Sequence, residues 1–302
     1  MDVSIIIVNY NTCTLTRNCL KSVFEQTKDI DFEVIVSDNG SKDGSIEMIK
    51  TEFPQVILVE NNANLGFGAA NNRGLKIAKG KYIFYLNSDT VLLNNAVKYF
   101  YNYWENSPEK DIIGALGGNL LDEQNNVIHS FDKFLHPWEE IWLFIKKMLS
   151  IRVKLFCDLL KINYQKFRKE KIKYFEQKGE VDFIIGADLF VKNNESAFYD
   201  ERYFLYYEET DLQYHLMKKG LKRIIISEPK TIHLCGQSGE SSNKENYVSF
   251  GKIQFDLSRI KFIKYNISKF CAGILKVLLY IHWMTPYFVA KTKKYRKEIW
   301  KI

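Results

Sequence analysis

Short apolar runs alternate with helix-length stretches in the first third of this 302-residue chain, and this alternation constrains the fold more than any other feature. The runs are rich in β-branched and aromatic residues, as in strands covered on both faces, and they occupy residues 3–8, 33–36, 56–59 and 82–86. The stretches between them occupy residues 14–26, 44–53 and 68–79. Because strand–helix–strand repeats connect by right-handed crossovers, the sequence predicts an α/β fold with a mostly parallel central sheet flanked by helices.

A polar cluster follows each of the four runs. These clusters are Asn9-Tyr10-Asn11, residues 38–41, residues 61–64 and Asn87-Ser88-Asp89. Ligands of parallel sheets bind beyond the carboxyl ends of the strands, where such clusters converge. Each cluster alone also fits turn or helix-capping chemistry, so only the combination indicates a site. The small residues of stretch 64–74 allow close backbone approach, without the GxGxxG spacing of a dinucleotide site.

Cysteine usage and the first residues favour a cytoplasmic protein. The five cysteines are scattered and never form a CxxC pair, so neither a disulfide framework nor a zinc ribbon is indicated. The chain starts directly with a strand-like run and shows no signal-peptide pattern. We therefore expect a reducing, cytoplasmic location.

Positive charge is concentrated in two segments. Residues 146–178 hold eleven Lys and Arg against three Asp and Glu, and residues 252–302 hold twelve against two. Apolar residues at helical spacing accompany both segments. Trp138, Ile141, Trp142, Ile145, Met148 and Leu149 form one helical face with Lys146 and Lys147 beside it, and Phe270, Ile274, Val277, Leu278 and Ile281 repeat the pattern in the second segment.

These basic apolar segments predict helices that lie on a membrane surface. The longest uncharged stretch, residues 277–290, is shorter than the ~20 residues that a spanning helix needs. An interfacial helix with basic residues against anionic lipid fits better. Packing of the helices on the domain or on a second copy of the chain remains open. No nucleic-acid partner is expected, because the aromatic residues follow an apolar helical face and no RNA-binding motif occurs.

The order of the polar motifs resembles a known family. Residues 4–11, 38–41, 64–74 and 86–89, followed by Gly186-Ala187-Asp188, residues 204–212, Gly220, Pro229 and His233, are similar to the family 2 inverting glycosyltransferases of the GT-A fold, in particular their rhamnosyltransferase-like branch. The resemblance covers roughly residues 1–240, with a poorly matched insertion at about 134–178. It implies a GT-A domain over residues 1–240, a helical basic insertion, and a C-terminal amphipathic basic helical segment over residues 241–302.

The resemblance implies a divalent metal site. Asp89 matches the carboxylate that binds Mg²⁺ or Mn²⁺ between the two phosphates of the donor, and His233 matches a second ligand. Many relatives have Asp-x-Asp at this point, whereas this chain begins the motif with Asn87.

The resemblance also implies a catalytic base at the start of a helix over residues 206–219. Glu209 is the first candidate, and Glu208 or Asp211 are alternatives for the same role. The same carboxylates also fit the helix dipole, which favours acidic residues in a first turn.

Nucleotide recognition is predicted at the same edge of the sheet. Asp38 matches the family carboxylate that accepts the N3–H of uracil or thymine, and Tyr10 is a candidate for stacking on the base. Asn64, Asn72 and Arg73 are candidates for contacts with ribose or diphosphate oxygens.

Together these expectations describe an inverting glycosyltransferase, a hexosyltransferase of cell-surface glycan or cell-wall synthesis. It would move a sugar, for example rhamnose, from a TDP- or UDP-sugar to a lipid-linked or polysaccharide acceptor at the inner face of the plasma membrane. The alternatives are a sugar nucleotidyltransferase and a catalytically silent nucleotide- or membrane-binding protein. The first is disfavoured because no Gly-rich, Lys-ended phosphate loop follows the first strand.

Overall fold

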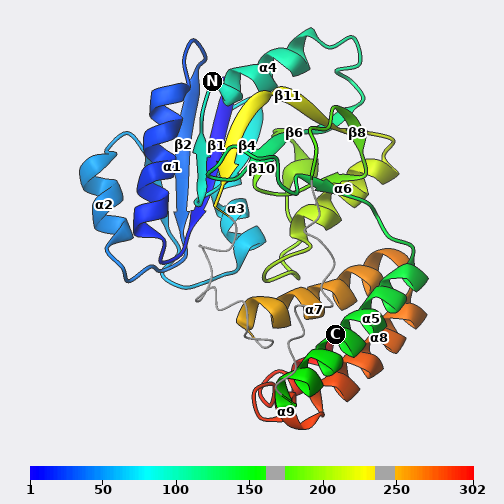
Figure 1. The fold of residues 1–302 in the computed structure, drawn as a ribbon. Helices are drawn as coiled ribbons and strands as arrows, with labels where there is room; N and C mark the ends of the chain where they lie inside the picture. The colour runs from blue at the N-terminus through cyan, green and yellow to red at the C-terminus, as the bar shows by residue number, and fades with distance from the viewer. Residues whose placement is uncertain (161–173, 235–248) are drawn as a thin grey trace. The chain divides into compact units, whose positions relative to one another are not determined.

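The computed structural model describes residues 1–160, 174–234 and 249–302, which fall into two compact units (Figure 1). The first unit comprises residues 1–134 and 174–242, and the second comprises residues 135–173 and 243–302. The insertion and the C-terminal segment, expected as separate pieces from the sequence, are therefore grouped in one unit.

A nine-stranded mixed sheet forms the centre of the first unit as described. Its order is β3-β2-β1-β4-β10-β6-β11-β5, and β8 pairs with β11. The strands are β1 (Val3–Asn9), β2 (Phe32–Asp38), β3 (Ile57–Glu60), β4 (Tyr82–Asn87), β5 (Thr90–Leu92), β6 (Ile113–Leu121), β8 (Gly179–Val181), β10 (Asp188–Lys192) and β11 (Lys222–His233). β1 to β4 are parallel to one another, whereas β10 runs antiparallel between β4 and β6. The predicted fold class, α/β with a mostly parallel central sheet, is confirmed.

Helices cover both faces of this sheet. They are α1 (Cys13–Gln26), α2 (Ser45–Glu52), α3 (Phe67–Leu75), α4 (Ala96–Asn106) and α6 (Glu208–Lys218). Successive side chains of a strand point to opposite faces, so Ile5 and Ile7 of β1 lie in one hydrophobic cluster and Ile6 lies in the other. The first cluster includes residues of α1, α2 and α4, and the second includes residues of α3 and α6. A separate two-stranded sheet pairs β7 (Phe131–Asp132) with β9 (Phe183–Ile184).

The second unit is helical throughout its described part. It contains α5 (Pro137–Leu159), α7 (Phe250–Phe262), α8 (Lys269–Trp283), α9 (Pro286–Val289) and α10 (Arg296–Lys301). Two ion pairs link α5 to α7: Arg259 Nε lies 3.1 Å from Glu140 Oε2, and Lys147 Nζ lies 3.0 Å from Asp256 Oδ1. Among the helices that the structure describes, none combines the length and the apolar character of a membrane span.

Candidate active site at the carboxyl ends of the parallel strands

The register of the sheet brings the predicted polar clusters to one edge. Asn9 at the end of β1 pairs with Asp38 at the end of β2, and the preceding Val8 pairs with Asn87 at the end of β4. The clusters that follow these strands are therefore neighbours in space. This adjacency is what the parallel arrangement predicts for a ligand site.

Asp38 organises the loop at this edge. Its Oδ1 accepts hydrogen bonds from the backbone N–H groups of Gly40 and Ser41, at 2.9 and 2.8 Å, and its Oδ2 accepts one from Asn9 Nδ2 at 2.5 Å. The side chain is fully buried. A carboxylate has about four acceptor sites, so Oδ2 retains one lone pair for a further donor. The neighbouring Tyr10 is 43% exposed.

The turn before α3 is locked to the segment that precedes α6. Gly66 has φ +91°, and a Cβ placed on it would lie 2.4 Å from the carbonyl oxygen of Phe204. The next residue, Phe67, donates its backbone N–H to the same oxygen at 2.9 Å. Only glycine fits this position, because no side chain has room there and the backbone conformation is one that L-residues rarely adopt. Asn64 supports the turn by accepting from Gly66 N at 3.0 Å, and its side chain remains exposed.

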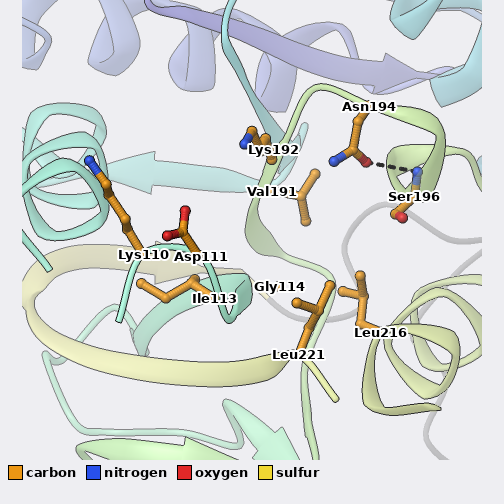
Figure 2. A pocket seen from close by; sticks show the side chains of 10 residues that line it. All are labelled: Lys110, Asp111, Ile113, Gly114, Val191, Lys192, Asn194, Ser196, Leu216 and Leu221. Atoms are coloured by element: carbon orange, nitrogen blue, oxygen red, sulfur yellow. Dashed lines mark hydrogen bonds between the residues drawn. The ribbon is translucent and has the colours of Figure 1, made fainter. Parts of the chain in front are cut away.

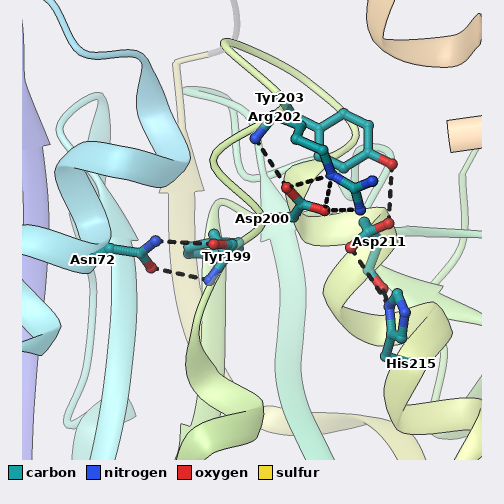
Figure 3. A network of polar contacts seen from close by, with 7 residues as sticks. All are labelled: Asn72, Tyr199, Asp200, Arg202, Tyr203, Asp211 and His215. Atoms are coloured by element: carbon teal, nitrogen blue, oxygen red, sulfur yellow. Dashed lines mark hydrogen bonds and ion pairs between the residues drawn. The ribbon is translucent and has the colours of Figure 1, made fainter. Parts of the chain in front are cut away.

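Asn72 differs from its predicted role. Its Nδ2 donates to the carbonyl oxygen of Tyr199 at 2.9 Å, and its Oδ1 accepts from the backbone N–H of Tyr199 at the same distance (Figure 3). Nδ2 also donates to Glu201 Oε1 at 3.1 Å, and the residue is buried. The amide therefore clamps the chain ahead of α6 rather than presenting itself to a ribose or diphosphate. Arg73, one residue later, is exposed.

Asp89 and His233 meet at the same edge although 144 positions separate them. The strands β5 and β11 run antiparallel, with Thr90 opposite His233. This pairing places His233 Nε2 3.4 Å from Asp89 Oδ1. Asp89 is buried, and the His233 side chain is 13% exposed. The sequence predicted that these two side chains act together, and the structure brings them into contact.

Three buried side-chain oxygens at this edge accept no hydrogen bond from the residues that the structure describes. They are Asn87 Oδ1, Asp89 Oδ1 and Asp188 Oδ1. Buried oxygens normally have a hydrogen-bond partner, so these three atoms are candidate positions for contact with an ion or water. Asp188 was quoted in the sequence motif without a role. It opens β10, pairs with Leu86 of β4, and accepts from Gly118 N at 3.2 Å. Burial raises the pKa of Asp188 to about 8, an effect that the hydrogen bond from Gly118 and the charge of His233 oppose.

The three candidate bases at the start of α6 differ in their surroundings. Asp211 accepts from Tyr203 Oη at 2.9 Å and lies 3.5 Å from His215 Nδ1, so it is engaged within the protein (Figure 3). Glu208 is 3% exposed, and its Oε2 accepts no hydrogen bond within the described chain. Glu209 is half-buried and packs over Gly186, whose missing Cβ leaves room for its side chain.

Burial governs the protonation of the two glutamates. Burial is the main cause that raises the pKa of Glu208 well above its usual range, and the charge of Glu209 raises it further. Burial also raises the pKa of Glu209. A raised carboxyl pKa is the property that suits a group exchanging a proton near neutral pH. Of the three candidates, Glu209 combines this property with access to solvent.

Tyr206 lies two residues before the acidic first turn of α6. Burial raises the pKa of Tyr206, with further contributions from the charges of Glu208, Glu209 and Asp89. Tyr206 and Tyr207 have φ +67° and +71°, two consecutive left-handed residues without a glycine. Each costs of order 1–3 kcal/mol, and such strain is concentrated at functional sites.

A cavity of about 140 Å³ lies at the opposite edge of the sheet (Figure 2). Its lining includes Ile113 at the start of β6 and Lys192 at the end of β10. Lys192 pairs with Tyr82 at the start of β4, whereas the candidate site lies where β4 ends. The cavity is therefore separate from the candidate site.

The arrangement of the chain is that of the GT-A glycosyltransferases. TarS of S. aureus superposes with a TM-score of 0.54 at 13% identity, covering 94% of this chain and 44% of TarS. A mannosyltransferase of Pyrobaculum calidifontis, solved in complex with GDP-Man and Mn²⁺, gives a TM-score of 0.52 at 16% identity, covering 97% of this chain and 73% of that one. At these identities the similarity shows the shared fold.

Sequence comparison then defines the family. Residues 4–178 match the model of Glycosyl transferase family 2, and the chain belongs to that family. A poly(ribitol-phosphate) beta-glucosyltransferase of Bacillus spizizenii is 34% identical over 123 residues, 39% of this chain and 19% of that protein. The poly(ribitol-phosphate) beta-N-acetylglucosaminyltransferase TarP of Staphylococcus aureus is 33% identical over 119 residues, 38% of this chain and 36% of TarP. The matches thus span between a fifth and two fifths of these relatives. The predicted glycosyltransferase family is confirmed.

Proposed function

We propose that the chain transfers a sugar, with inversion, from a TDP- or UDP-sugar to a lipid-linked or polysaccharide acceptor in cell-surface glycan synthesis, with rhamnose as one candidate sugar. The observation that carries the proposal is the contact of Asp89 with His233 at the edge where Glu209 also lies, since Glu209 packs over Gly186 and the next residue, Ala187, accepts a hydrogen bond from Asn87 N at 3.0 Å. Inverting transfer needs a cation on the side of the departing diphosphate and a base on the side of the acceptor. This edge offers residues for both.

The donor set fits a hard divalent cation such as Mg²⁺ or Mn²⁺. Asp89 Oδ1 and Asn87 Oδ1 are buried oxygens without a hydrogen bond from the described chain, and His233 Nε2 faces Asp89. No group of three or more His, Cys, Asp or Glu side chains in the described ranges is arranged to hold a metal. A cation that takes its remaining ligands from the diphosphate and from water needs only a few ligands from the protein. When bound, the cation would neutralise charge on the departing diphosphate.

Glu209 is our candidate for the base. Its carboxylate would accept the proton of the acceptor hydroxyl as that oxygen bonds to the anomeric carbon and the bond from carbon to the diphosphate oxygen breaks. General base catalysis of this kind contributes ~10²- to 10⁴-fold in rate. Asp211 is engaged by Tyr203 and His215, and Glu208 is buried, so both are less accessible to an acceptor hydroxyl than Glu209 is.

For the nucleotide, our candidates are Tyr10, Asp38, Asn64 and Arg73. Tyr10 is exposed for stacking on a base, and Asp38 Oδ2 retains one acceptor position for the N3–H of a pyrimidine. Arg73 is exposed, and its guanidinium suits a phosphate oxygen. Asn72 is withdrawn from this set because its amide is bonded to the backbone of Tyr199.

The acceptor proposal draws on the relatives. Two of them are named for poly(ribitol-phosphate), a polymer that carries phosphates, so a polymeric acceptor of cell-wall type is the first to test. We propose that transfer takes place in the cytoplasm at the inner face of the plasma membrane, where lipid-linked acceptors are available.

The test is thermal unfolding of the intact chain with TDP, UDP, GDP or ADP, each with and without Mg²⁺ or Mn²⁺. A ligand at ~100 times its dissociation constant adds ~2.7 kcal/mol, which raises the midpoint by roughly 5 to 11 °C at 2 to 4 °C per kcal/mol. We expect a metal-dependent shift with TDP or UDP, and its loss in Asp89→Asn and in His233→Ala.

A surface pair of the same chemistry provides the control. His129 Nε2 lies 3.3 Å from Asp132 Oδ2, and both side chains are exposed. The variants Asp132→Asn and His129→Ala should keep the full shift. If no nucleotide shifts the midpoint in the presence of metal, the catalytically silent alternative gains support. A Glu209→Gln enzyme with unchanged turnover would refute the role of this base even where the nucleotide binds.

A further inference from the structure

Helix α5 of the second unit is apolar on two separate faces. Ile141, Phe144 and Met148 are buried inside the unit. A second row, spaced as one helical stripe, is exposed to solvent and comprises Trp138, Trp142, Leu149, Val153 and Phe156. The sequence placed Ile141 and Met148 on the same face as Trp138, whereas the structure separates them and extends the exposed row to Phe156. From Trp138 to Phe156 the row is about 27 Å long at 1.5 Å per residue.

Helix α8 repeats this arrangement. Its buried row includes Cys271, Leu275 and Leu279, while the opposite side exposes Phe270, Val277 and Ile281, and the exposed Met284 follows directly after the helix. The two exposed rows meet at one end, where the rings of Trp138 and Phe270 contact each other edge to face with centroids 6.5 Å apart. Figure 1 shows α5 and α8 side by side. The two rows are named here the α5–α8 stripe.

The unit that carries the stripe is strongly cationic. The second unit carries twenty-three Lys and Arg against seven Asp and Glu. Two of its acidic side chains, Glu140 and Asp256, are already paired within the unit. Lys146 lies over the ring of Trp142 at 5.2 Å, so a cation stands at the border of the stripe. The exposed Lys291, Lys293, Lys294 and Lys297 follow α8 and α9 in the chain.

We propose that the α5–α8 stripe is a membrane-docking surface, which lies flat in the headgroup layer of an anionic bilayer. This inference extends the membrane contact within the proposed function and does not depend on the donor, the metal or the base. Exposed tryptophan beside lysine is the pattern of helices that lie in this layer, where the rings sit at headgroup depth and the cations meet lipid phosphates.

Charge favours a bilayer over a second copy of the chain as the occupant. Two copies joined through this stripe would bring two strongly positive units together, and like charges across an interface oppose association. An anionic lipid surface instead adds attraction for each lysine close to it. The apolar area enters the headgroup layer at the same time, so both features of the surface are used.

The experiment is flotation of the intact chain with vesicles of phosphatidylcholine alone and of phosphatidylcholine mixed with phosphatidylglycerol. We expect binding to the anionic vesicles and a blue shift of tryptophan fluorescence on binding, since Trp138 and Trp142 leave water. The double variant Trp142→Ser/Phe156→Ser should lower the affinity by roughly tenfold or more. Tyr99→Ser, a change at an exposed aromatic of α4 in the first unit, is the matched control and should bind as the intact chain does.

Replacing Lys291, Lys293 and Lys294 by Gln should reduce the preference for anionic vesicles. Equal binding of Trp142→Ser/Phe156→Ser and the intact chain would overturn the proposal. A second result would also overturn it: the intact chain forms dimers in solution, whereas the double variant is monomeric and still binds vesicles as the intact chain does. The stripe would then be the interface between two copies. Since the assay contains no nucleotide, its failure leaves the nucleotide test of the proposed transferase unaffected.

Discussion

Replacing Gly66 by alanine tests the lock between the turn before α3 and the segment before α6. At Gly66, φ is +91° and ψ is 171°, a region that is essentially restricted to glycine and costs about 1–3 kcal/mol for another residue. The added Cβ would also lie 2.4 Å from the Phe204 carbonyl oxygen, which the backbone of Phe67 needs as its acceptor. Loss of that hydrogen bond adds ~0.5–1.5 kcal/mol. We expect Gly66→Ala to destabilise the chain by roughly 2–4 kcal/mol.

Two further glycines separate the contributions. Gly44 has φ +85° with no atom within 4 Å of an added Cβ, so Gly44→Ala measures backbone strain alone, about 1–2 kcal/mol. Gly273, inside α8, has no atom within 4 Å and no left-handed backbone, so Gly273→Ala should stabilise its helix by ~0.5–1 kcal/mol.

The assay is urea unfolding followed by circular dichroism, with the transitions of the two units fitted separately where they are resolved. The reasoning is refuted if the free energy of unfolding of Gly66→Ala lies within about 0.5 kcal/mol of that of the original chain. It is also refuted if Gly44→Ala is destabilised as much as Gly66→Ala, because the contact with Phe204 would then contribute nothing.

Three other predictions follow from the polar groups of the site. Burial raises the pKa of Glu209, so the acidic limb of kcat/KM should lie above the ordinary glutamate value of 4.5, and a limb at or below it would contradict the assignment of this base. Because the raised pKa of Glu208 favours its protonated form in the folded state, stability should decrease as pH rises from ~4.5 through the folded pKa. Glu208→Gln should make this decrease smaller, as measured by urea midpoints at acidic and neutral pH, and Glu209 and Asp188, whose pKa values burial also raises, should account for what is left. The same slope in both proteins would show that Glu208 does not contribute. Asn72→Ala leaves the buried backbone N–H and carbonyl of Tyr199 without their partner, so we expect urea unfolding to show a free energy of unfolding lower by roughly 2–4 kcal/mol. Unchanged stability together with weaker nucleotide binding would instead support the predicted contact with the ligand.

The elements that the sequence predicted correctly are those with a local signal. β1, β2 and β4 each contain a short run of β-branched or aromatic apolar residues, and the helices between them begin and end within a few residues of their predicted bounds. The pairing of Asp89 with His233 came from the order of family motifs, since nothing near either residue indicates a partner 144 positions away.

Other features depend on contacts between distant segments, which local patterns do not record. β10 lies between β4 and β6 because of the packing of the whole sheet, and this position also buries Asp188, the first residue of β10. Asn72 was assigned to a ligand because an amide near a glycine-rich turn suits one. Its true partner, the backbone of Tyr199, lies 127 positions away.

The central position of β10 has a consequence for synthesis on the ribosome. β1 to β4 are complete once residue 87 has been made, but the inner edge of β4 gains its neighbour only when Lys192 has emerged. At ~5–20 residues per second this interval is about 5 to 20 s. During it, the nascent sheet carries an open edge that can pair with another chain. β6 also lacks a partner until β10 has been made, since its two partners in the described sheet are β10 and β11. A product truncated near residue 178 would keep that edge open permanently, so aggregation of such fragments is the expected result of early termination.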